Sequence, residues 1–196
     1  MTSRLLLATN NPGKLCELKK LLAGVPFVMV SPADIGIKLK VVETGRTYAA
    51  NARLKAMVFT EATGLLTLAD DSGLEVDALG GAPGVLSSRY AGEKATDADR
   101  IACLLQKLKG VPWYKRSAKF QCVMALGTPF GVLKLVTGSC RGVISEKPMG
   151  TNGFGYDPLF FFPKLGKTMA ELSPEVKNTI SHRARAAIRA REILRS

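Results

Sequence analysis

Two adjacent carboxylates are the residues of this sequence that most directly suggest chemistry. The stretch LLTLADDSGLEVDALGGAPG, residues 65–84, places Asp70 and Asp71 where an apolar, strand-like run ends. Successive side chains of a strand point to opposite faces, so both acids cannot face one cleft if the strand continues through them. One could then bind a metal ion or activate water while the other orients its neighbours. A turn with two solvated acids gives the same residue pattern.

A second candidate is ATNNPGK, residues 8–14, where an apolar run gives way to a tight turn and then a lysine. Backbone N–H groups at the start of a helix bind anions, and Lys14 would add a positive charge. The Walker pattern G-x-x-x-x-G-K-[ST] is absent. The stretch therefore fits either a phosphate-binding turn or a plain connection from strand to helix.

Three further groups could complete a site. Glu43 offers a hard oxygen ligand for Mg²⁺, although an acid before a helix also fits an interaction with the helix dipole. The segment GTNGFGYDPLFFF, residues 150–162, combines small residues with aromatic rings that could stack on a base, but an ordinary loop with core aromatics looks alike. Lys177, His182 and Arg183 gather near the start of a C-terminal helix.

The elements that must position these groups follow from apolar periodicity and turn residues. Strands are expected at residues 4–9, 65–70 and 158–162, with a hairpin of two long strands within 117–142. Helices are expected at residues 14–24, 46–64 and 96–110, and after Ser173 and Ser181. This mixture predicts the α/β class with a mixed sheet, and the length suits one domain of residues 1–196.

Composition narrows the class of protein. The formal charge of +12 favours a polyanionic partner, which could be nucleic acid, anionic lipid or a polyphosphate ligand. The apolar runs are too short for a membrane span or a signal peptide, so we expect a cytoplasmic protein with no membrane partner. One histidine and four scattered cysteines exclude a clustered zinc site. Phosphate-binding, carboxylate and aromatic groups together suit a nucleoside triphosphate with Mg²⁺.

Five segments, in this order, resemble the inosine triphosphate pyrophosphatase family, whose bacterial members are often called XTP/dITP diphosphatases. They are TNNPGK, ETGRTYAANARLKA, ADDSGLEVDALGGAPGVLSSRYAG, GFGYDPLFF and AELSPEVKNTISHR. The resemblance implies hydrolysis of deaminated purine nucleoside triphosphates (ITP, dITP and XTP) to the monophosphate and pyrophosphate, with Mg²⁺ as cofactor. It also implies a homodimer and an elongated α/β body, with a long mixed sheet and the active site in a cleft between two lobes.

The resemblance also assigns roles. Asp71 matches the catalytic acid, a Mg²⁺ ligand that activates water, and Glu43 matches a second metal ligand; Asp70 is expected to support them from the other face. The positions that match substrate contacts are Thr9, Asn10, Asn11, Pro12, Gly13, Lys14, Ser72, Phe154, Gly155, Tyr156, Asp157, Lys177, His182 and Arg183. Donors such as His182 and Arg183 would favour a 6-keto purine over adenine, because a keto group accepts hydrogen bonds and an amino group donates them.

Two alternatives are weaker. A Maf-type nucleotide pyrophosphatase has a related fold and a different base preference, and the segments GFGYDP and SHR argue against it. A non-enzymatic protein that binds nucleic acid through its positive charge would bind with a steep salt dependence. That reading leaves the ADDSG acids unexplained, so we expect no stable nucleic-acid partner.

Overall fold

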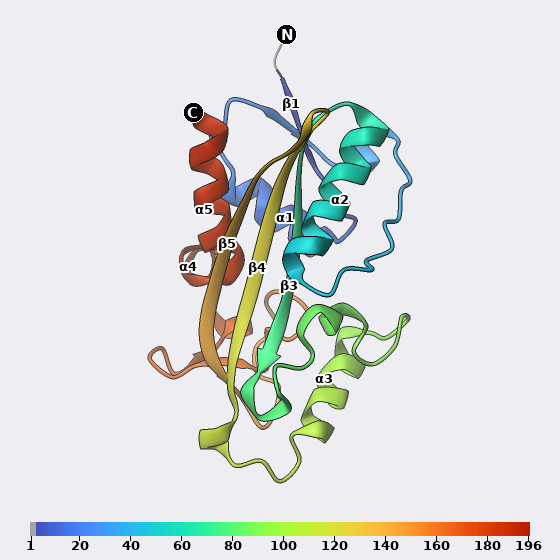
Figure 1. The fold of residues 1–196 in the computed structure, drawn as a ribbon. Coiled ribbons are helices and arrows are strands. Elements are labelled where there is room, and N and C mark those ends of the chain that lie inside the picture. Colours follow the sequence, from blue (N-terminus) through green and yellow to red (C-terminus); the bar gives the residue numbers. More distant parts are fainter. Residues whose placement is uncertain (1–2) are drawn as a thin grey trace. The chain divides into compact units, whose positions relative to one another are not determined.

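The structure is a computed structural model that describes residues 3–196 and, within them, every side chain except that of Leu133. Its strands form a seven-stranded sheet of order β2-β1-β3-β4-β5-β6-β7 (Figure 1). The bounds are β1 Arg4–Leu7, β2 Val28–Val30, β3 Leu66–Val76, β4 Ser117–Thr128, β5 Gly131–Ile144, β6 Phe160–Phe162 and β7 Lys167–Thr168. Because β1 pairs parallel with β2 and β3 while β5, β6 and β7 pair antiparallel, the predicted mixed α/β class is confirmed.

Five α-helices occur in this part of the chain: α1 Pro12–Leu21, α2 Tyr48–Thr63, α3 Asp97–Lys107, α4 Pro174–Ile180 and α5 His182–Arg195. Short 3-10 turns lie at Ala33–Ile35, Asp77–Leu79, Gly84–Arg89, Trp113–Lys115 and Met169–Glu171. The side chains of Asn11, Thr47, Thr96 and Ser173 each accept an N–H bond from the first turn of the helix that follows. Such caps satisfy backbone donors that have no partner within the helix, which explains why the predicted helices begin where they do.

The chain divides into two compact units. The first comprises Met1–Asp71, Cys122–Gly138 and Arg183–Ser196, and the second comprises Ser72–Gln121 and Ser139–His182. Each unit is assembled from segments that alternate along the sequence, and β3, β4 and β5 contribute residues to both. The single domain of residues 1–196 and the cleft between two lobes stay predictions.

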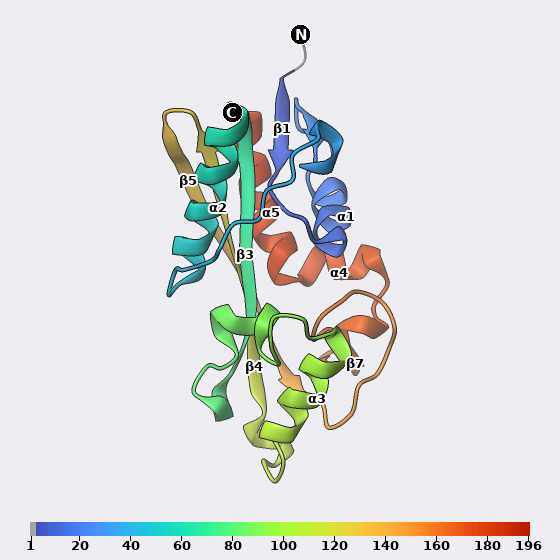
Figure 2. The ribbon, with the colours of Figure 1, turned by 90° about the vertical axis from the view of Figure 1, so that its right-hand side faces the viewer.

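In the first unit, helices cover both faces of the strands, with α2 on one face and α1 and α5 on the other (Figure 2). The core on the α1 and α5 face contains Leu5, Leu7 and Leu68 from the strands, together with residues such as Leu18 and Ala187. The alternate residues of β1 and β3 therefore face α2, as the two-residue period of a strand requires.

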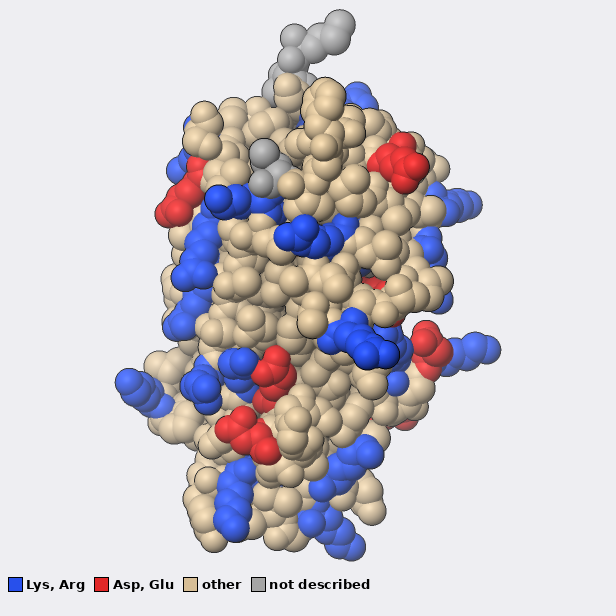
Figure 3. All heavy atoms as spheres, in the orientation of Figure 1, with Lys and Arg blue, Asp and Glu red and all other residues tan. Residues whose placement is uncertain are grey.

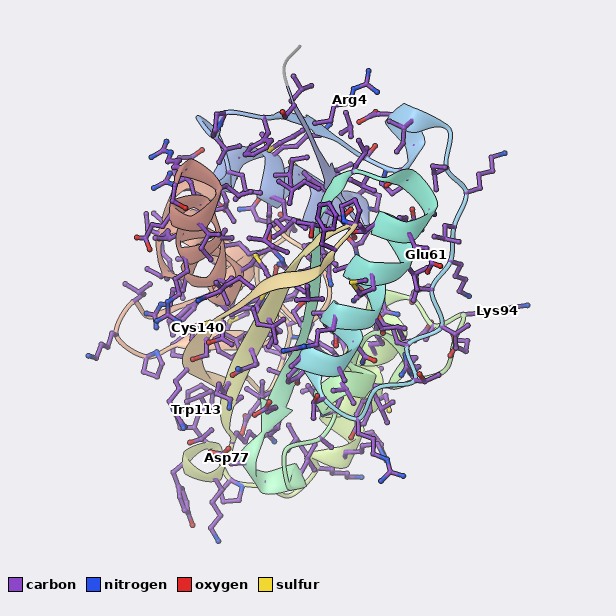
Figure 4. The ribbon with its side chains drawn as sticks, turned by 45° about the horizontal axis from the view of Figure 1, so that its top comes forward. Arg4, Glu61, Asp77, Lys94, Trp113 and Cys140 are labelled. Atoms are coloured by element: carbon purple, nitrogen blue, oxygen red, sulfur yellow. The ribbon has the colours of Figure 1, made fainter. Side chains whose placement is uncertain are left out.

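The second unit has its own core, in which Leu74, Phe120 and Phe160 pack with Leu104 of α3. Trp113, labelled in Figure 4, lies at its surface with 41% of its area exposed and meets Phe161 edge to face, with 5.4 Å between the ring centres. Among residues 3–196, no helix combines the length and apolar character that a membrane crossing requires.

Strand β3 is longer than the sequence predicted. The expected strand ended at residue 70, but the strand continues to Val76, so both acids lie in its interior. The physical reason is that Leu74 and Val76 are fully buried in the core of the second unit and continue the alternation beyond Gly73. This finding overturns the solvated turn as an explanation for Asp70 and Asp71.

Candidate functional site

Asp70 faces α1 and α5 and is almost completely buried, with 2% of its area exposed. Its Oδ2 lies 3.1 Å from Nζ of Lys14 and 3.3 Å from Nη2 of Arg183, whose Nη1 donates to Oε2 of Glu17 at 2.7 Å. Burial by itself would raise the pKa of Asp70, but the charges of Lys14, Arg183 and Lys55 hold it well below its usual range. Asp70 is therefore a buried anion that ties both helices to β3.

Asp71 faces the opposite helix, α2. Its Oδ1 accepts from Nζ of Lys55 at 2.9 Å, and its Oδ2 accepts from Nδ2 of Asn51 at 3.2 Å. Burial raises the pKa of Asp71, and the nearby ammonium of Lys55 offsets only part of that effect. The alternation predicted from the sequence thus gives the two acids different partners and opposite pKa shifts.

Lys55 joins the two predicted metal ligands. Its Nζ donates to Oε1 of Glu43 at 2.8 Å as well as to Asp71, so both carboxylates converge on one positive charge. Burial tends to lower the pKa of Lys55, but the charges of Asp71, Asp70 and Glu43 raise it overall. Two carboxylates already gathered around a cation suit Mg²⁺, which takes one or two carboxylates and completes its shell with water and phosphate. Within residues 3–196, no cluster of three or more acidic, histidine or cysteine ligands occurs.

Gly45 allows this cluster to form. Its N–H donates to Oδ1 of Asn51 at 2.8 Å, while the amide nitrogen of the same side chain donates to Asp71. A Cβ atom on Gly45 would lie 2.5 Å from that Oδ1 and 2.8 Å from Cβ of Ala50, so a larger residue must displace Asn51. The loop before α2 therefore sets the orientation of a side chain that contacts the predicted catalytic acid.

The predicted phosphate turn lies between β1 and α1 in the same unit. Asn11 caps the helix through its Oδ1, which accepts from the N–H of Lys14 at 3.0 Å, and its own N–H donates to Oγ1 of Thr9 at 3.1 Å. Asn10 donates to the carbonyl of Leu39 at 2.9 Å. Asn10, Asn11 and Pro12 are exposed, and Gly13 is half-buried, so the start of α1 is accessible to an anion.

In the second unit, the segment 150–157 is organised around Asp157, which is buried. Its Oδ2 accepts from Nζ of Lys177 at 2.5 Å and from the N–H of Phe154 at 3.0 Å. A Cβ atom on Gly153 would lie 2.0 Å from that same Oδ2, so only glycine fits here. The ring of Phe154 lies beside the ammonium of Lys177, at 5.1 Å from its centre. The structure thus brings together three of the predicted substrate contacts.

Tyr156 and His182 are less accessible. Tyr156 has 4% of its area exposed, belongs to the core and donates from its hydroxyl to the carbonyl of Ser87 at 3.0 Å. His182 has 4% exposed and stacks on Phe120, with 4.6 Å between ring centres and an interplanar angle of 12°. Phe154 and Tyr156 carry the rings that were predicted to stack on a base, and the half-buried Phe154 is the more accessible of these two. Ser72 follows Asp71 along β3 and is also half-buried.

Three residues that contact the predicted site were not singled out from the sequence. Lys55 and Asn51 hold Asp71, and Glu17 holds Arg183. The sequence could have indicated that Asn51 and Lys55 act together, because residues four positions apart on a helix share one face. Glu17 likewise lies one turn after Lys14 in α1, although nothing in the sequence pairs it with a residue 166 positions away.

The ion pairs of Asp70 predict a pH-dependent loss of stability in Asp70→Asn. Removing one partner of a buried ion pair costs about 3–5 kcal/mol, so we expect a loss of that order in the free energy of unfolding at pH 7. Because the pKa of Asp70 is lower in the folded chain than in the unfolded chain, its contribution is fully present above about pH 4 and is lost progressively as the pH falls from there toward the lowered pKa of the folded chain. Urea unfolding should therefore show a smaller difference in the free energy of unfolding between wild type and Asp70→Asn at pH 3 than at pH 7.

Asp71→Asn is the matched control. Its carboxylate is disfavoured by burial, and Lys55 keeps Glu43 as a partner, so the substitution should stay within about 1 kcal/mol of wild type. Equal destabilisation by the two substitutions would contradict the division of roles between the two faces.

A second prediction concerns Gly45→Ala. The added Cβ displaces Asn51, and we expect at least a tenfold loss of the turnover of deaminated purine nucleotides that the resemblance implies, since a displaced supporting group misplaces Asp71. Gly36→Ala is the control, because its Cβ would meet no atom within 4 Å, although its φ of +70° strains the backbone. Similar turnover in both variants, measured by pyrophosphate release, would show that Gly45 does not act through Asn51.

The chain is similar to known proteins over almost its whole length. The sequence profile of the Ham1 family matches residues 5–193. A dITP/XTP pyrophosphatase of Geobacter sulfurreducens is 50% identical over 184 residues, which cover 94% of this chain and 92% of that protein. One from Desulforamulus reducens is 51% identical over 191 residues, covering 97% and 95%.

Solved structures give the same result. A HAM1 protein from Coxiella burnetii has a TM-score of 0.87 and 42% identity over 98% of both chains. A nucleoside-triphosphatase, or dITP/XTP pyrophosphatase, from Mycobacterium abscessus has a TM-score of 0.76 and 44% identity over 98% of this chain and all of that one. The resemblance drawn from five sequence segments is thereby confirmed, and the chain belongs to the Ham1 family.

Proposed function

We propose that this chain is a Mg²⁺-dependent pyrophosphatase that hydrolyses ITP, dITP and XTP to the monophosphate and pyrophosphate. The observation that carries the proposal is the convergence of Glu43 and Asp71 on Lys55, in a chain about half identical to relatives named dITP/XTP pyrophosphatase. Removal of such nucleotides would keep deaminated bases out of DNA and RNA.

Glu43 and Asp71 are the residues that would hold Mg²⁺, and the ion would supply charge to offset the triphosphate and to acidify water. Asp71 is the group that takes the proton from the attacking water. Asp71 lies beside Lys55 and Asn51 at the predicted metal site, where a water acidified by the ion would need only a modest base. Attack on the α-phosphorus breaks the α–β phosphoanhydride bond and releases pyrophosphate.

The phosphate tail would bind at residues 9–14. Lys14 supplies a positive charge, and the turn supplies backbone N–H groups that donate to phosphate oxygens. Lys14 already pairs with Asp70, so its ammonium is held in one place before any substrate arrives. Such preorganisation reduces the entropy lost on binding.

In the second unit, the segment 153–157 offers the Phe154 ring and Lys177 offers a charge, and the contact of these groups with the base stays a prediction. Discrimination by His182 and Arg183 stays a prediction. Arg183 divides its guanidinium between Asp70 and Glu17, which fixes its plane but leaves it less to offer a base. A homodimer and a cytoplasmic location also stay predictions, and sedimentation equilibrium will determine the first.

Nucleic-acid binding through the positive charge stays the weaker alternative. On the face drawn in Figure 3, several Lys and Arg side chains follow one edge, and the others are separated by uncharged surface. Binding of nucleic acid would leave the convergence of Glu43 and Asp71 on Lys55 without a role, whereas a polyphosphate ligand suits both that cluster and the charge of +12.

The test is pyrophosphate release from ITP, dITP, XTP, GTP and ATP, with and without Mg²⁺. We expect kcat/KM for ITP and XTP to exceed that for ATP and GTP, and we expect no turnover without the metal. Asp71→Asn should lower kcat by about 10²–10⁴, the usual contribution of a general base.

Asp77→Asn is the matched control for that measurement, because Asp77 is exposed in the turn Asp77–Leu79 and is labelled in Figure 4. It should leave turnover unchanged. Full activity in Asp71→Asn would refute the catalytic assignment, and equal rates on all five nucleotides would refute the substrate assignment and favour a different pyrophosphatase.

A further inference from the structure

An acid at the start of α3 reaches the segment that carries Phe154. Asp97 is the first residue of the helix, and its Oδ2 accepts from the backbone N–H of Gly155 at 2.7 Å, across 58 residues of sequence. Both residues belong to the second unit. Nothing in the sequence pattern pairs these two positions.

Arg100 holds Asp97 in place. Its Nη2 pairs with Oδ1 of Asp97, while its Nη1 donates to the carbonyls of Ser88 at 3.0 Å and Ala95 at 2.5 Å. The Arg100 side chain is 17% exposed, so the guanidinium is anchored between a helix and the segment before it. The carboxylate of Asp97 is therefore shared between a fixed cation and one backbone N–H.

The bond to Gly155 fixes a single peptide unit. The N–H of Gly155 donates to Asp97, and the carbonyl of the same unit, on Phe154, accepts from the N–H of Asp157 at 3.3 Å. With both polar groups bonded, the peptide plane that follows Phe154 is restrained, and with it the backbone from which the Phe154 side chain extends. Gly155 itself has a φ of +62°, a left-handed conformation that favours glycine.

The role of a helix cap does not explain Asp97. Thr96 and Asp99 already form a complete capping box at the start of α3, in which each side chain bonds to the backbone of the other. Asp97 and Asp99 both lie in the first turn and interact alike with the helix dipole. Only Asp97 reaches Gly155, so the two acids form a natural pair for comparison.

We propose that Asp97, held by Arg100, is a positioning residue for nucleotide binding. It fixes the Phe154–Gly155 peptide so that the Phe154 ring is ready to receive the base; this inference rests on the proposed function. Because the ring contacts the base equally in the ground state and the transition state, the loss of Asp97 weakens substrate binding and leaves the chemical step intact.

The test separates KM from kcat. For the substrate that the wild type hydrolyses best, Asp97→Ala should raise KM about fivefold with kcat unchanged, as expected for one hydrogen bond to a charged, partly exposed group. Asp97→Asn keeps an oxygen that can accept from Gly155 and should return KM to within about twofold of wild type. Arg100→Gln should raise KM less than Asp97→Ala, and the double variant should be no worse than Asp97→Ala alone.

Asp99→Ala is the matched control. It removes the capping box and should lower the midpoint of urea unfolding, while KM stays at the wild-type value. Trp113, the single tryptophan and a residue of the second unit, reports unfolding by its fluorescence.

An active wild type with the same KM in Asp97→Ala, or with KM raised equally in Asp99→Ala, would overturn the positioning role alone. A fall in kcat at unchanged KM would also contradict it. An inactive wild type would overturn the proposed function and this inference with it.

Discussion

The burial of Asp70 between two cations is the constraint on which the first unit depends. One carboxylate with 2% of its area exposed meets Lys14 from α1 and Arg183 from α5, so three elements converge on a charge that water does not solvate. An unpaired charge in that position would be very unfavourable, and this fixes where both helices lie on β3. The same ion pairs hold Lys14 at the start of α1, where an anion can bind, so a stabilising interaction also prepares a binding group.

The position and the pKa of Asp71 also follow from the geometry of β3. Because strand geometry turns it away from Asp70, it lies on the α2 face, where Lys55 and Asn51 provide weaker compensation for burial. One residue along the chain therefore separates an anion with a lowered pKa from one with a raised pKa. Two neighbouring acids with pKa values moved in opposite directions are typical of sites where one group is structural and the other reacts.

Much of the fold and of the candidate site could be predicted from the sequence, and the predictions that failed did so for physical reasons. Alternation along β3 separated Asp70 from Asp71, and the capping residues Thr96 and Ser173 located the starts of α3 and α4. The strand was predicted too short because Ser72 and Gly73 suggest a turn, whereas the burial of Leu74 keeps the backbone extended.

Local sequence patterns could not predict contacts between residues that lie far apart in the sequence. The position of Lys55 relative to Asp71 depends on how α2 packs on the sheet, and the bond from Asp97 to Gly155 spans 58 residues. Family resemblance predicted Asp157 and Lys177 as substrate contacts, and the structure shows that these two residues form an ion pair with each other.

The pKa values of the two neighbouring acids are shifted in opposite directions, and NMR titration of their side-chain carboxyl carbons in the metal-free protein measures this directly. We expect Asp70 to stay ionised throughout the usual range of aspartate titration, about pH 3–5, and Asp71 to titrate above the usual aspartate value of about 3.9. Coincident titration of the two carboxyls near the usual value, or protonation of Asp70 before Asp71 as the pH falls, would contradict this expectation.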